Sequence, residues 1–293
     1  MLTAIVPVSE MSGRLHNLED WLSAIHHLDI KVIIVHDYRD SETELQLLSI
    51  LNSINSSKII FLSGTFGSPG AARNAGLERV ESKFVCFWDS DDLPNPQSII
   101  TQLEIYSKDC DILVGQYVRS SIHPKKMQHA KSKDCSINDV AMNPGLWRMI
   151  FRRDYISSVK FQNMRMGEDQ LFLAEVMILK PRMCFTHTVF YNYFVGHPGQ
   201  LTQSPAAISE LVVAFREILT LRKSTSGIEF EFASIIASRM NFTLARFAFL
   251  NKDFFYISRT LFLPSNLITN HPFVQIKCAL FVVLRLFRLT VHA

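Results

Sequence analysis

Residues 84–96 read FVCFWDSDDLPNP, an apolar run that ends in a cluster of aspartates and two prolines. The five apolar residues at its start are too few for a typical helix and suit a strand buried on both faces. The prolines prevent this strand from continuing, so the aspartates lie at its carboxyl end, where ligands bind in open α/β sheets. The cluster consists of Asp89, Ser90, Asp91 and Asp92.

Three carboxylates this close together repel one another, which raises their pKa values and costs stability unless a cation lies among them. Carboxylate oxygens are hard ligands of the kind that Mg²⁺ and Mn²⁺ prefer. The cluster therefore predicts a divalent metal site. A solvated turn is the alternative, because aspartate is also a common turn residue.

Length and composition set broad limits. With 293 residues and a hydrophobic fraction of 48%, the chain can bury the core of one large domain, or of one domain with an appendage. A net charge of +3 is too small to predict nucleic-acid binding. The five cysteines have no paired spacing, which favours reduced thiols in the cytoplasm. The N-terminal MLTAIVPVSEM lacks the basic leader of a secretion signal, so we expect an intracellular protein.

Strands and helices alternate before the aspartate cluster. Short apolar runs at 4–8, 31–35 and 59–62 predict strands, and segments with helical spacing at 15–28 and 43–54 separate them. This alternation predicts an α/β fold.

Two further segments bring polar groups near strand ends. Asp37 follows the second strand, where it is either a ligand-binding acid or a turn cap. The third strand is followed by GTFGSPGAARNAGLERV, residues 64–80, in which glycines precede a helix. The amides at the start of that helix, together with Arg73, are suited to a phosphate. The loop matches neither the P-loop nor the dinucleotide pattern.

After the cluster we expect a helix at 98–106 and, at 111–118, a strand whose polar flanks predict an edge of the sheet. Residues 120–139 are polar, with four lysines, and predict a long loop near an opening. That loop is either a solvated excursion or a contact for phosphate or acceptor. Trp147 offers an aromatic face of the kind on which sugars stack, although a core position is the more common role of tryptophan.

Glu168 and Asp169 precede a helical segment, QLFLAEVMIL, at 170–179. Two acids at this place also cap a helix, because they satisfy free amides and the macrodipole. A further strand at 188–194 leads to His197 in a loop rich in glycine and proline. His197 is either a metal ligand or a solvated loop residue.

In their order along the chain, these pieces resemble a glycosyltransferase of family 2, the inverting GT-A type. The matching segments are IVPVS, VIIVHD, GSPGAARNAGL, FWDSDDLPNP, GEDQLF and the aromatic strand before His197. No single motif is decisive, but their common order is strong support. The resemblance covers residues 1–204 and implies a Rossmann-like catalytic domain with a mixed, mainly parallel sheet that binds a nucleotide-sugar.

The resemblance also implies roles for individual residues on the donor side. Pro7 and Asp37 would hold the nucleotide base, and Arg73 would lie by the base or the diphosphate. Asp89 and Asp91 resemble the ends of the family's DxD motif, and Asp91 matches the direct metal ligand. The residue between them, Ser90, falls within the same donor-binding segment.

On the acceptor side, Asp169 matches the family's general base, and Trp147 and Glu168 are candidate acceptor contacts. His197 resembles a residue that closes over the diphosphate or the metal. The second-strand motif departs from the family pattern, because His36 stands where an acid is common. This departure leaves the identity of the nucleotide base open.

From Pro205 onward the pattern changes to helices alone, which predicts a helical appendage over 205–293. Its last segment, 271–293, has apolar residues along one side and basic residues on another, and its longest uncharged run is too short to span a bilayer. We expect a basic amphipathic helix on the anionic inner face of the cell membrane. Packing on the catalytic domain, or on the second subunit of a homodimer, is the alternative.

Together these features predict an enzyme that uses Mn²⁺ or Mg²⁺ to move a hexose or N-acetylhexosamine from a nucleotide-sugar to an acceptor hydroxyl. UDP is the default nucleotide, and we expect a role in bacterial surface polysaccharide or lipid-linked glycan synthesis. A Mg²⁺-dependent phosphatase of the haloacid-dehalogenase type also has Asp-x-Asp after a strand. In that class, however, Thr or Val stands where this chain has Leu93. A non-catalytic nucleotide-sugar-binding module would lack the acid or a metal ligand, and this sequence has both.

Overall fold

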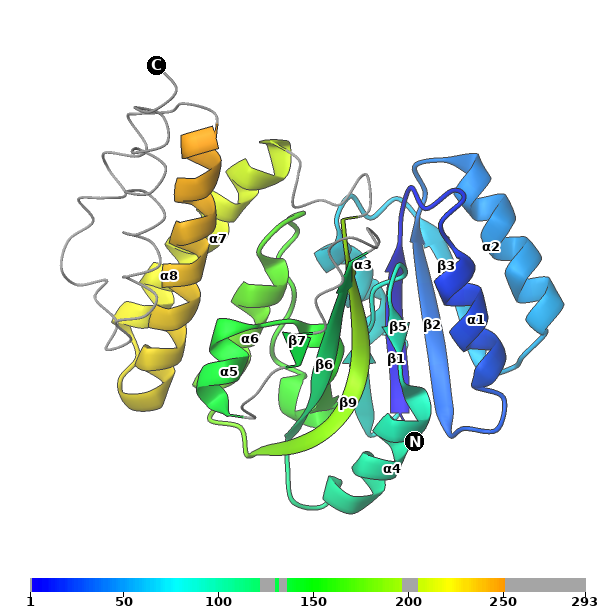
Figure 1. The fold of residues 1–293 in the computed structure, drawn as a ribbon, viewed down its shortest axis with the longest axis horizontal. Coiled ribbons are helices and arrows are strands. Elements are labelled where there is room, and N and C mark those ends of the chain that lie inside the picture. Colours follow the sequence, from blue (N-terminus) through cyan, green and yellow to red (C-terminus); the bar gives the residue numbers. More distant parts are fainter. Residues whose placement is uncertain (1, 122–129, 132–135, 197–204, 251–293) are drawn as a thin grey trace.

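The computed structural model describes residues 2–121, 130–131, 136–196 and 205–250 (Figure 1). Within these residues, nine strands form one sheet in the order β3-β2-β1-β4-β8-β6-β9-β5, and β7 pairs with β6. The strands are β1 (Leu2–Val8), β2 (Ile30–Asp37), β3 (Ile59–Gly64), β4 (Phe84–Phe87), β5 (Leu93–Pro94), β6 (Ile112–Ser121), β7 (Ala130–Lys131), β8 (Met149–Arg152) and β9 (Met183–Val195). The α-helices are α1 (His16–Ala24), α2 (Ser41–Ile54), α3 (Pro69–Leu77), α4 (Pro96–Tyr106), α5 (Ile137–Met142), α6 (Glu168–Ile178), α7 (Pro205–Lys223) and α8 (Gly227–Leu250), and the short 3-10 helices are η2 (Leu146–Arg148) and η3 (Arg153–Ile156).

The sheet is mixed and mainly parallel. β3, β2, β1 and β4 run parallel to one another, and β6 runs parallel to β9. β8 lies antiparallel between β4 and β6, and β5 is antiparallel to β9. The predicted α/β fold with a mixed, mainly parallel sheet is therefore confirmed.

Local sequence explains where the helices begin. The side chain of Asp40 accepts a hydrogen bond of 2.6 Å from the amide of Thr43 and so caps α2. Ser68 caps α3 in the same way, through a bond of 3.1 Å from the amide of Ala71. Prolines occupy the first turns of α3 and α4, where no helical hydrogen bond is lost.

One strand lies elsewhere than predicted. The polar flanks of residues 111–118 predicted an edge strand, but β6 lies between β8 and β9. The flanking Asp111 is compensated rather than solvated, because its carboxylate pairs with Arg182 at 3.0 Å and with Arg152 at 3.4 Å. A paired acid at the end of a strand is thus compatible with a place inside the sheet.

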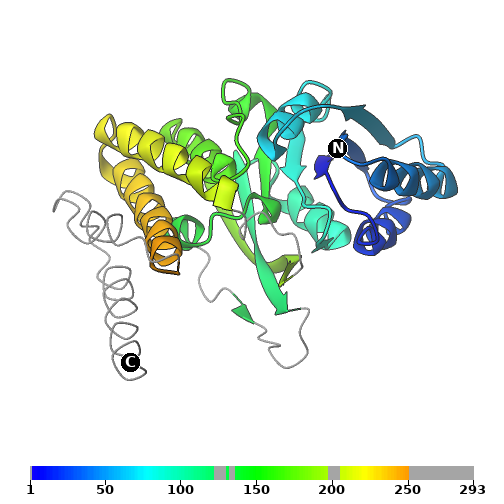
Figure 2. The ribbon, with the colours of Figure 1, turned by 90° about the horizontal axis from the view of Figure 1, so that it is seen from above.

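Two apolar cores lie on opposite faces of the sheet. One lies under α1, α2 and α4 and includes Leu18, Leu47 and Ile99. The other lies under α3, α5, α6, α7 and α8 and includes Phe172 and Ile236. Figure 2 shows α1 and α2 at one end of the molecule and the α7–α8 pair at the other.

The C-terminal part is helical as far as the structure describes it. α7 and α8 pack on each other and on α6, and α8 also contacts α5. Their residues Phe215 and Met240 belong to the same core as Ile5 and Phe87 of the sheet. α7 and α8 therefore form a layer on the part of the chain that contains the sheet, and the predicted division at residues 204 and 205 stays a prediction.

Several predictions concern residues that lie outside the described part of the chain. These are the part of the helical appendage beyond residue 250, which includes 271–293, most of the loop 120–139, and His197. Among the described helices, none has the length and apolar character needed to cross a membrane. Cys86, Cys110 and Cys184 are free thiols.

Candidate active site

β1 and β4 separate near the middle of the sheet, where the strand order reverses. Their pairing extends to Ile5 and Phe87, and the amide of Trp88 donates a bond of 3.0 Å to the carbonyl oxygen of Ile5. β1 stays paired with β2 as far as Val8. Pro7 lies two residues beyond Ile5, so its nitrogen, which has no hydrogen to donate, faces the side that β4 has left. This is the point where ligands bind in sheets of this kind.

Side chains from two other elements hold the aspartate loop that follows β4. The hydroxyl of Tyr191, on β9, accepts a hydrogen bond of 2.9 Å from the amide of Asp89. The side-chain amide of Asn17, in the first turn of α1, donates a bond of 2.7 Å to the carbonyl oxygen of Asp91. Both bonds go to the backbone, so neither of them uses the carboxylate of Asp89 or Asp91.

Asp92 has a different environment and ties the same loop to β9. Its Oδ1 accepts a bond of 2.7 Å from the amide of Phe194, and its Oδ2 is buried without a hydrogen-bond partner among the described residues. Burial raises the pKa of Asp92 well above its usual range, and the charges of Asp91 and Asp89 add to the rise. Asp92 thus packs into the fold rather than facing a ligand.

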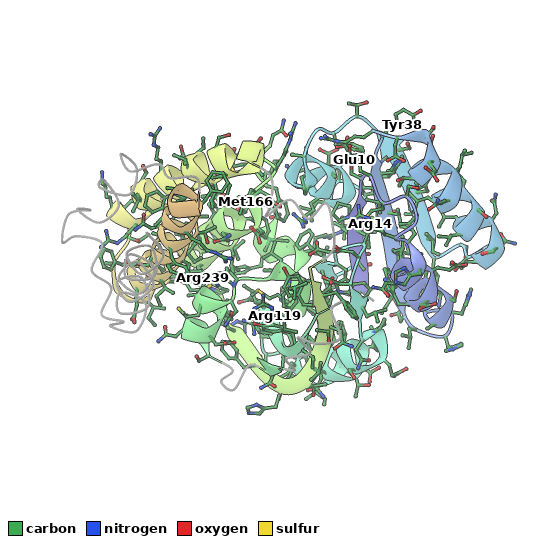
Figure 3. The ribbon with its side chains drawn as sticks, turned by 45° about the horizontal axis from the view of Figure 1, so that its top comes forward. Glu10, Arg14, Tyr38, Arg119, Met166 and Arg239 are labelled. Carbon is green, nitrogen blue, oxygen red and sulfur yellow. The ribbon has the colours of Figure 1, made fainter. Side chains whose placement is uncertain are left out.

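Asp91 carries excess negative charge next to Asp89. Burial raises the pKa of the Asp91 carboxyl to about 6, and the charge of Asp89 adds to this rise, whereas Arg14 opposes it. Arg14 comes from the loop between β1 and α1, and Figure 3 shows it beside α1. Ser90, between the two acids, is buried. A cation beside Asp91 would lower its pKa, so these residues fit a divalent metal with hard oxygen ligands.

The structure brings two of the three predicted metal ligands together, namely Asp89 and Asp91. The third, His197, lies outside the described residues. Within the described ranges, no group of three histidine, cysteine, aspartate or glutamate side chains is placed to hold a metal ion.

Arg73, on α3, joins the aspartate loop to the start of α6. Its Nη1 donates to Oε1 of Glu168 at 2.6 Å, and its Nη2 donates to Oδ1 of Asp89 at 3.1 Å. The guanidinium also lies over the ring of Phe161, 5.5 Å from its centroid. Arg73 and Glu168 are both buried. Three residues predicted at the site therefore form one network.

Asp169 lies next to this network in the first turn of α6. Its Oδ1 accepts a bond of 2.8 Å from the amide of Gln170, so it also acts on the helix terminus, as the capping alternative expected. Burial raises the pKa of Asp169 to about 7, and the charge of Glu168 adds to the rise, whereas Arg73 opposes it. A carboxylate with a pKa near neutrality is suited to accept a proton from a hydroxyl.

The loop before α6 is held by α7. Gly167 has a φ of 90°, and a Cβ atom at this position would lie 2.7 Å from the Cβ of Ala214 on α7. The amide of Arg165 donates a hydrogen bond to the carboxylate of Glu210, also on α7. The C-terminal helices therefore help to position Glu168 and Asp169.

Asp37 shapes the glycine-rich loop that precedes α3. Its Oδ1 accepts bonds from the amides of Phe66 at 2.7 Å and Gly67 at 3.0 Å, and its Oδ2 accepts one from Nε of Arg39 at 3.0 Å. Burial alone would raise the pKa of Asp37, but these hydrogen bonds lower it below its usual value. The ionised carboxylate of Asp37 thus holds the glycine-rich loop through hydrogen bonds to its amides. The contact of Asp37 with a nucleotide base stays a prediction.

Trp147 belongs to an aromatic cluster next to the aspartate loop. Its ring stacks on Tyr191 and Tyr193, with 4.8 Å and 5.2 Å between ring centroids. It meets the ring of Tyr117 edge-on, with 4.8 Å between centroids. Through Tyr191 it supports the backbone of Asp89. Trp147 is thus partly buried and packs against the core, and its contact with an acceptor sugar stays a prediction.

Sequence reasoning did not find Tyr191 or Asn17. Tyr191 is one of several aromatic residues in β9, and nothing local marks its hydroxyl as the one that meets Asp89. Asn17 lies in the first turn of α1 and has no motif around it. Their roles come from contacts between segments far apart in the chain.

Several known proteins are similar to this chain. The glycosyltransferase GlyA of Streptococcus pneumoniae is 21% identical over 241 residues, which cover 75% of this chain and 34% of that protein. The chain thus spans about a third of the length of this curated relative. TarS 1-349 of S. aureus in complex with UDP-GlcNAc has a TM-score of 0.60 at 17% identity and covers 86% of this chain and 72% of that chain. The mannosyltransferase PcManGT of Pyrobaculum calidifontis, in complex with GDP-Man and Mn²⁺, has a TM-score of 0.59 at 11% identity. The match covers 95% of this chain and 86% of that chain.

At these identities the structural likeness is one of fold, and it confirms the predicted GT-A architecture. The family model described as Glycosyl transferase family 2 matches residues 5–180, which hold Pro7, Asp37, the aspartate loop and the pair of Arg73 and Glu168. Because this match spans more than half of the sequence, the chain belongs to glycosyl transferase family 2.

Proposed function

We propose that this chain transfers a sugar from a nucleoside-diphosphate sugar to an acceptor hydroxyl, with inversion at the anomeric carbon and with the help of Mn²⁺ or Mg²⁺. The observation that carries the proposal is the network in which Arg73 contacts both Asp89 and Glu168. This network supports the proposal because Asp89 is a predicted donor-binding acid and Glu168 directly precedes Asp169, the predicted base. A hexose or N-acetylhexosamine carried by UDP is the first donor to test, because TarS is similar in fold and was solved with UDP-GlcNAc.

On the donor side, Pro7 and Asp37 border the base, since they lie at the carboxyl ends of β1 and β2. Asp89 and Asp91 are the residues that would hold the metal, with His197 as a candidate further ligand. A bound divalent ion supplies positive charge that stabilises the departing diphosphate. Ser90 belongs to the same donor-binding loop.

In the chemical step, Asp169 acts as the general base. Its carboxylate accepts the proton of the acceptor hydroxyl, while that oxygen forms a bond to the anomeric carbon of the donor sugar. The bond from this carbon to the phosphate oxygen breaks, and its electron pair stays on the nucleoside diphosphate. Attack opposite to the leaving group gives inversion, as in inverting glycoside hydrolases. General-base help of this kind contributes about 10²- to 10⁴-fold in rate.

We further propose that the acceptor belongs to a bacterial surface polysaccharide or a lipid-linked glycan. Trp147 and Glu168 stay candidate acceptor contacts, although in the structure Glu168 pairs with Arg73 and Trp147 stacks on two tyrosines. Residues 271–293 would lie on the inner face of the membrane, with contact in a homodimer as the alternative. Sedimentation with anionic vesicles separates these two roles, because only the membrane role predicts that deleting 271–293 abolishes binding.

A panel of nucleotide-sugars tests the donor. We expect a UDP-sugar with Mn²⁺ to raise the melting temperature of the protein, because a ligand that binds only the folded state stabilises it. Nucleoside diphosphate release should follow when an acceptor is added. GDP-Man serves as the comparison donor, since PcManGT was solved with it. A non-catalytic module would show the stabilisation without release, and failure of every nucleotide-sugar to bind would contradict the proposal.

The phosphatase alternative predicts a different outcome in the same assay. A haloacid-dehalogenase-type enzyme would release inorganic phosphate from a phosphate monoester and would not need a nucleotide-sugar. The family match gives this alternative no support.

A further inference from the structure

Arg239 is a cation on the core-facing side of α8. It follows the buried Ile235 by one helical turn and directly precedes the buried Met240. Figure 3 shows Arg239 on the side of α8 that faces the middle of the molecule, and α8 packs there on α5 and α6. Its Nη1 atom is buried and has no hydrogen-bond partner among the residues that the structure describes. Because a buried donor without a partner costs free energy, this position calls for an explanation.

The surroundings of Arg239 leave its charge incompletely balanced. The groups whose charges act on it are Asp169, Tyr117 and Arg148. Arg148 has its own counter-ion, because its Nη1 pairs with Asp139 at 2.8 Å. Asp169 is the acidic group of the three, and it is the residue proposed to take up a proton during the reaction. An additional anion would therefore be stabilised at this place.

The position of Arg239 favours the acceptor over the donor as the source of that anion. The charges that act on Asp91, the predicted metal ligand, are those of Asp89 and Arg14. Arg239 instead directly precedes Met240, whose Cε atom lies 3.4 Å from the position of a Cβ atom at Gly167, two residues before Asp169. The charge of Asp169 also acts on Arg239. An anion bound by Arg239 would thus lie beside the base and not beside the donor's diphosphate.

A further arginine acts on the same tyrosine as Arg239. Arg119, on β6, is exposed, and both Arg119 and Arg239 act on Tyr117. The guanidinium group presents a planar fork of donors that matches the oxygens of a phosphate or a carboxylate. Arginine at this place is therefore suited to bind an oxyanion.

We propose that Arg239 is a specificity-determining residue that binds an oxyanion carried by the acceptor, next to the hydroxyl that Asp169 deprotonates. This inference rests on the proposed function and names the class of its acceptor, a sugar or polyol that bears a phosphate or a carboxylate. The C-terminal helices thereby contribute a residue to the site as well as supporting its backbone.

Binding of small anionic probes tests the inference on the full chain. Glycerol 3-phosphate and glucuronate are titrated calorimetrically, with glycerol and glucose as the matched neutral probes. We expect the wild type to bind one anionic probe, and Arg239→Met to weaken that binding by about tenfold or more, because hydrogen bonds to charged groups are strong. Arg239→Lys should keep part of it. The probe that depends on Arg239 tells whether the oxyanion is a phosphate or a carboxylate.

Arg246 provides the matched control, because it is an exposed arginine on the same helix. Arg246→Met should bind the anionic probe as the wild type does. Arg239→Met should also keep or raise the melting temperature, since it removes a buried charge without a full complement of partners. A lower melting temperature together with unchanged probe binding would mean that Arg239 is structural, and would overturn the inference.

Titration of UDP with Mn²⁺ separates this inference from the proposed function. If UDP binds wild type and Arg239→Met alike and only the anionic probe is lost, both stand. If UDP binds but the anionic probes bind Arg239→Met unchanged, or do not bind the wild type, the inference is wrong and the proposed function stands. If the anionic probe depends on Arg239 but no nucleotide or nucleotide-sugar binds, the anion site holds and the proposed function fails.

Discussion

Arg73 and Glu168 form a buried ion pair, with 2.6 Å between Nη1 and Oε1. The pair joins α3 to α6 and so connects the parallel half of the sheet to the segment that carries Asp169. Because the same guanidinium also contacts Asp89 at 3.1 Å, it holds both sides of the site in one arrangement.

Removing Arg73 should therefore destabilise the fold strongly. Arg73→Met leaves Glu168 buried without a partner, and we expect it to lower the free energy of unfolding by about 3–5 kcal/mol. Adding Glu168→Gln should restore part of the loss, because the uncompensated charge is then gone. Denaturant unfolding of the two single variants and the double variant measures the coupling between them.

Arg165 is the control for this cycle. It pairs with Glu210 at 3.9 Å, and both side chains are partly exposed. Arg165→Met should cost no more than about 1 kcal/mol, since exposed ion pairs contribute little. Equal losses for Arg73→Met and Arg165→Met would mean that burial of the Arg73 pair has no energetic effect.

Asp169 should set the pH dependence of turnover. The pKa of its carboxyl is raised to about 7, mainly by burial, and only the deprotonated form can act as a base. We expect turnover to rise as the pH increases through 7 and then to level off. Asp169→Asn should keep donor binding but lose nearly all turnover. Wild-type turnover in this variant would remove Asp169 from the role.

The same raised pKa predicts a stability effect of definite sign. Between the ordinary pKa of 3.8 and about 7, the folded protein binds more protons at Asp169 than the unfolded chain does. Stability therefore decreases as the pH rises through this window. Asp169→Asn removes the effect, so the variant without ligands should melt above the wild type at pH 8, with a smaller difference near pH 4. If Asp169→Asn and the wild type had the same melting temperature at pH 8 as well as near pH 4, the Asp169 carboxyl would be fully solvated in the folded protein.

The sequence predicts the parallel half of the sheet well, because each strand there begins as an apolar run. β1, β2 and β4 are largely buried, whereas the edge strand β3 is only partly buried. Side-chain caps also mark the starts of α2, α3 and α4, although α1 has none. The run at 31–35, for example, lies within β2. The sequence does not predict β8, because the four residues at 149–152 form a strand only by pairing with β4 and β6 on either side. The place of β6 inside the sheet depends on the same long-range pairing.

The sequence likewise predicts some of the site residues and misses others. Asp89, Asp91 and Asp169 stand next to strand or helix ends, where a local pattern marks them. Tyr191 and Arg239 have no such mark, because Tyr191 is one aromatic among several in β9 and Arg239 resembles an ordinary polar residue of an amphipathic helix. Only the packing of distant segments gives them a role.

Asp91→Asn should abolish the metal-dependent part of donor binding. The substitution removes a negative charge and one hard oxygen ligand, so Mn²⁺ should no longer strengthen UDP binding in a calorimetric titration. Asp92→Asn is the matched comparison, because Asp92 accepts a hydrogen bond from the amide of Phe194 and an asparagine oxygen can accept it too. If Asp91→Asn titrates as the wild type does while the metal effect disappears in Asp92→Asn, the two assignments must be exchanged.

Gly167→Ala should disturb the site through the C-terminal helices. Its φ of 90° disfavours any side chain, and the new Cβ would lie 2.7 Å from the Cβ of Ala214. We expect a loss of stability of roughly 1–3 kcal/mol from the backbone alone, with the clash adding to it, and a fall in turnover because Asp169 follows two residues later.

Two further variants separate the clash from the backbone strain. Ala214→Gly in the Gly167→Ala background removes the clash and leaves the strain, so it should restore part of the stability and of the turnover. Gly13→Ala carries strain alone, because Gly13 has a φ of 70° and nothing within 4 Å of an added Cβ. If α7 positions the base, Gly167→Ala will lose turnover. Gly13→Ala will keep its turnover even under conditions in which the two variants are equally stable. Parallel losses in both would mean that the contact between α7 and the start of α6 serves the fold without serving catalysis.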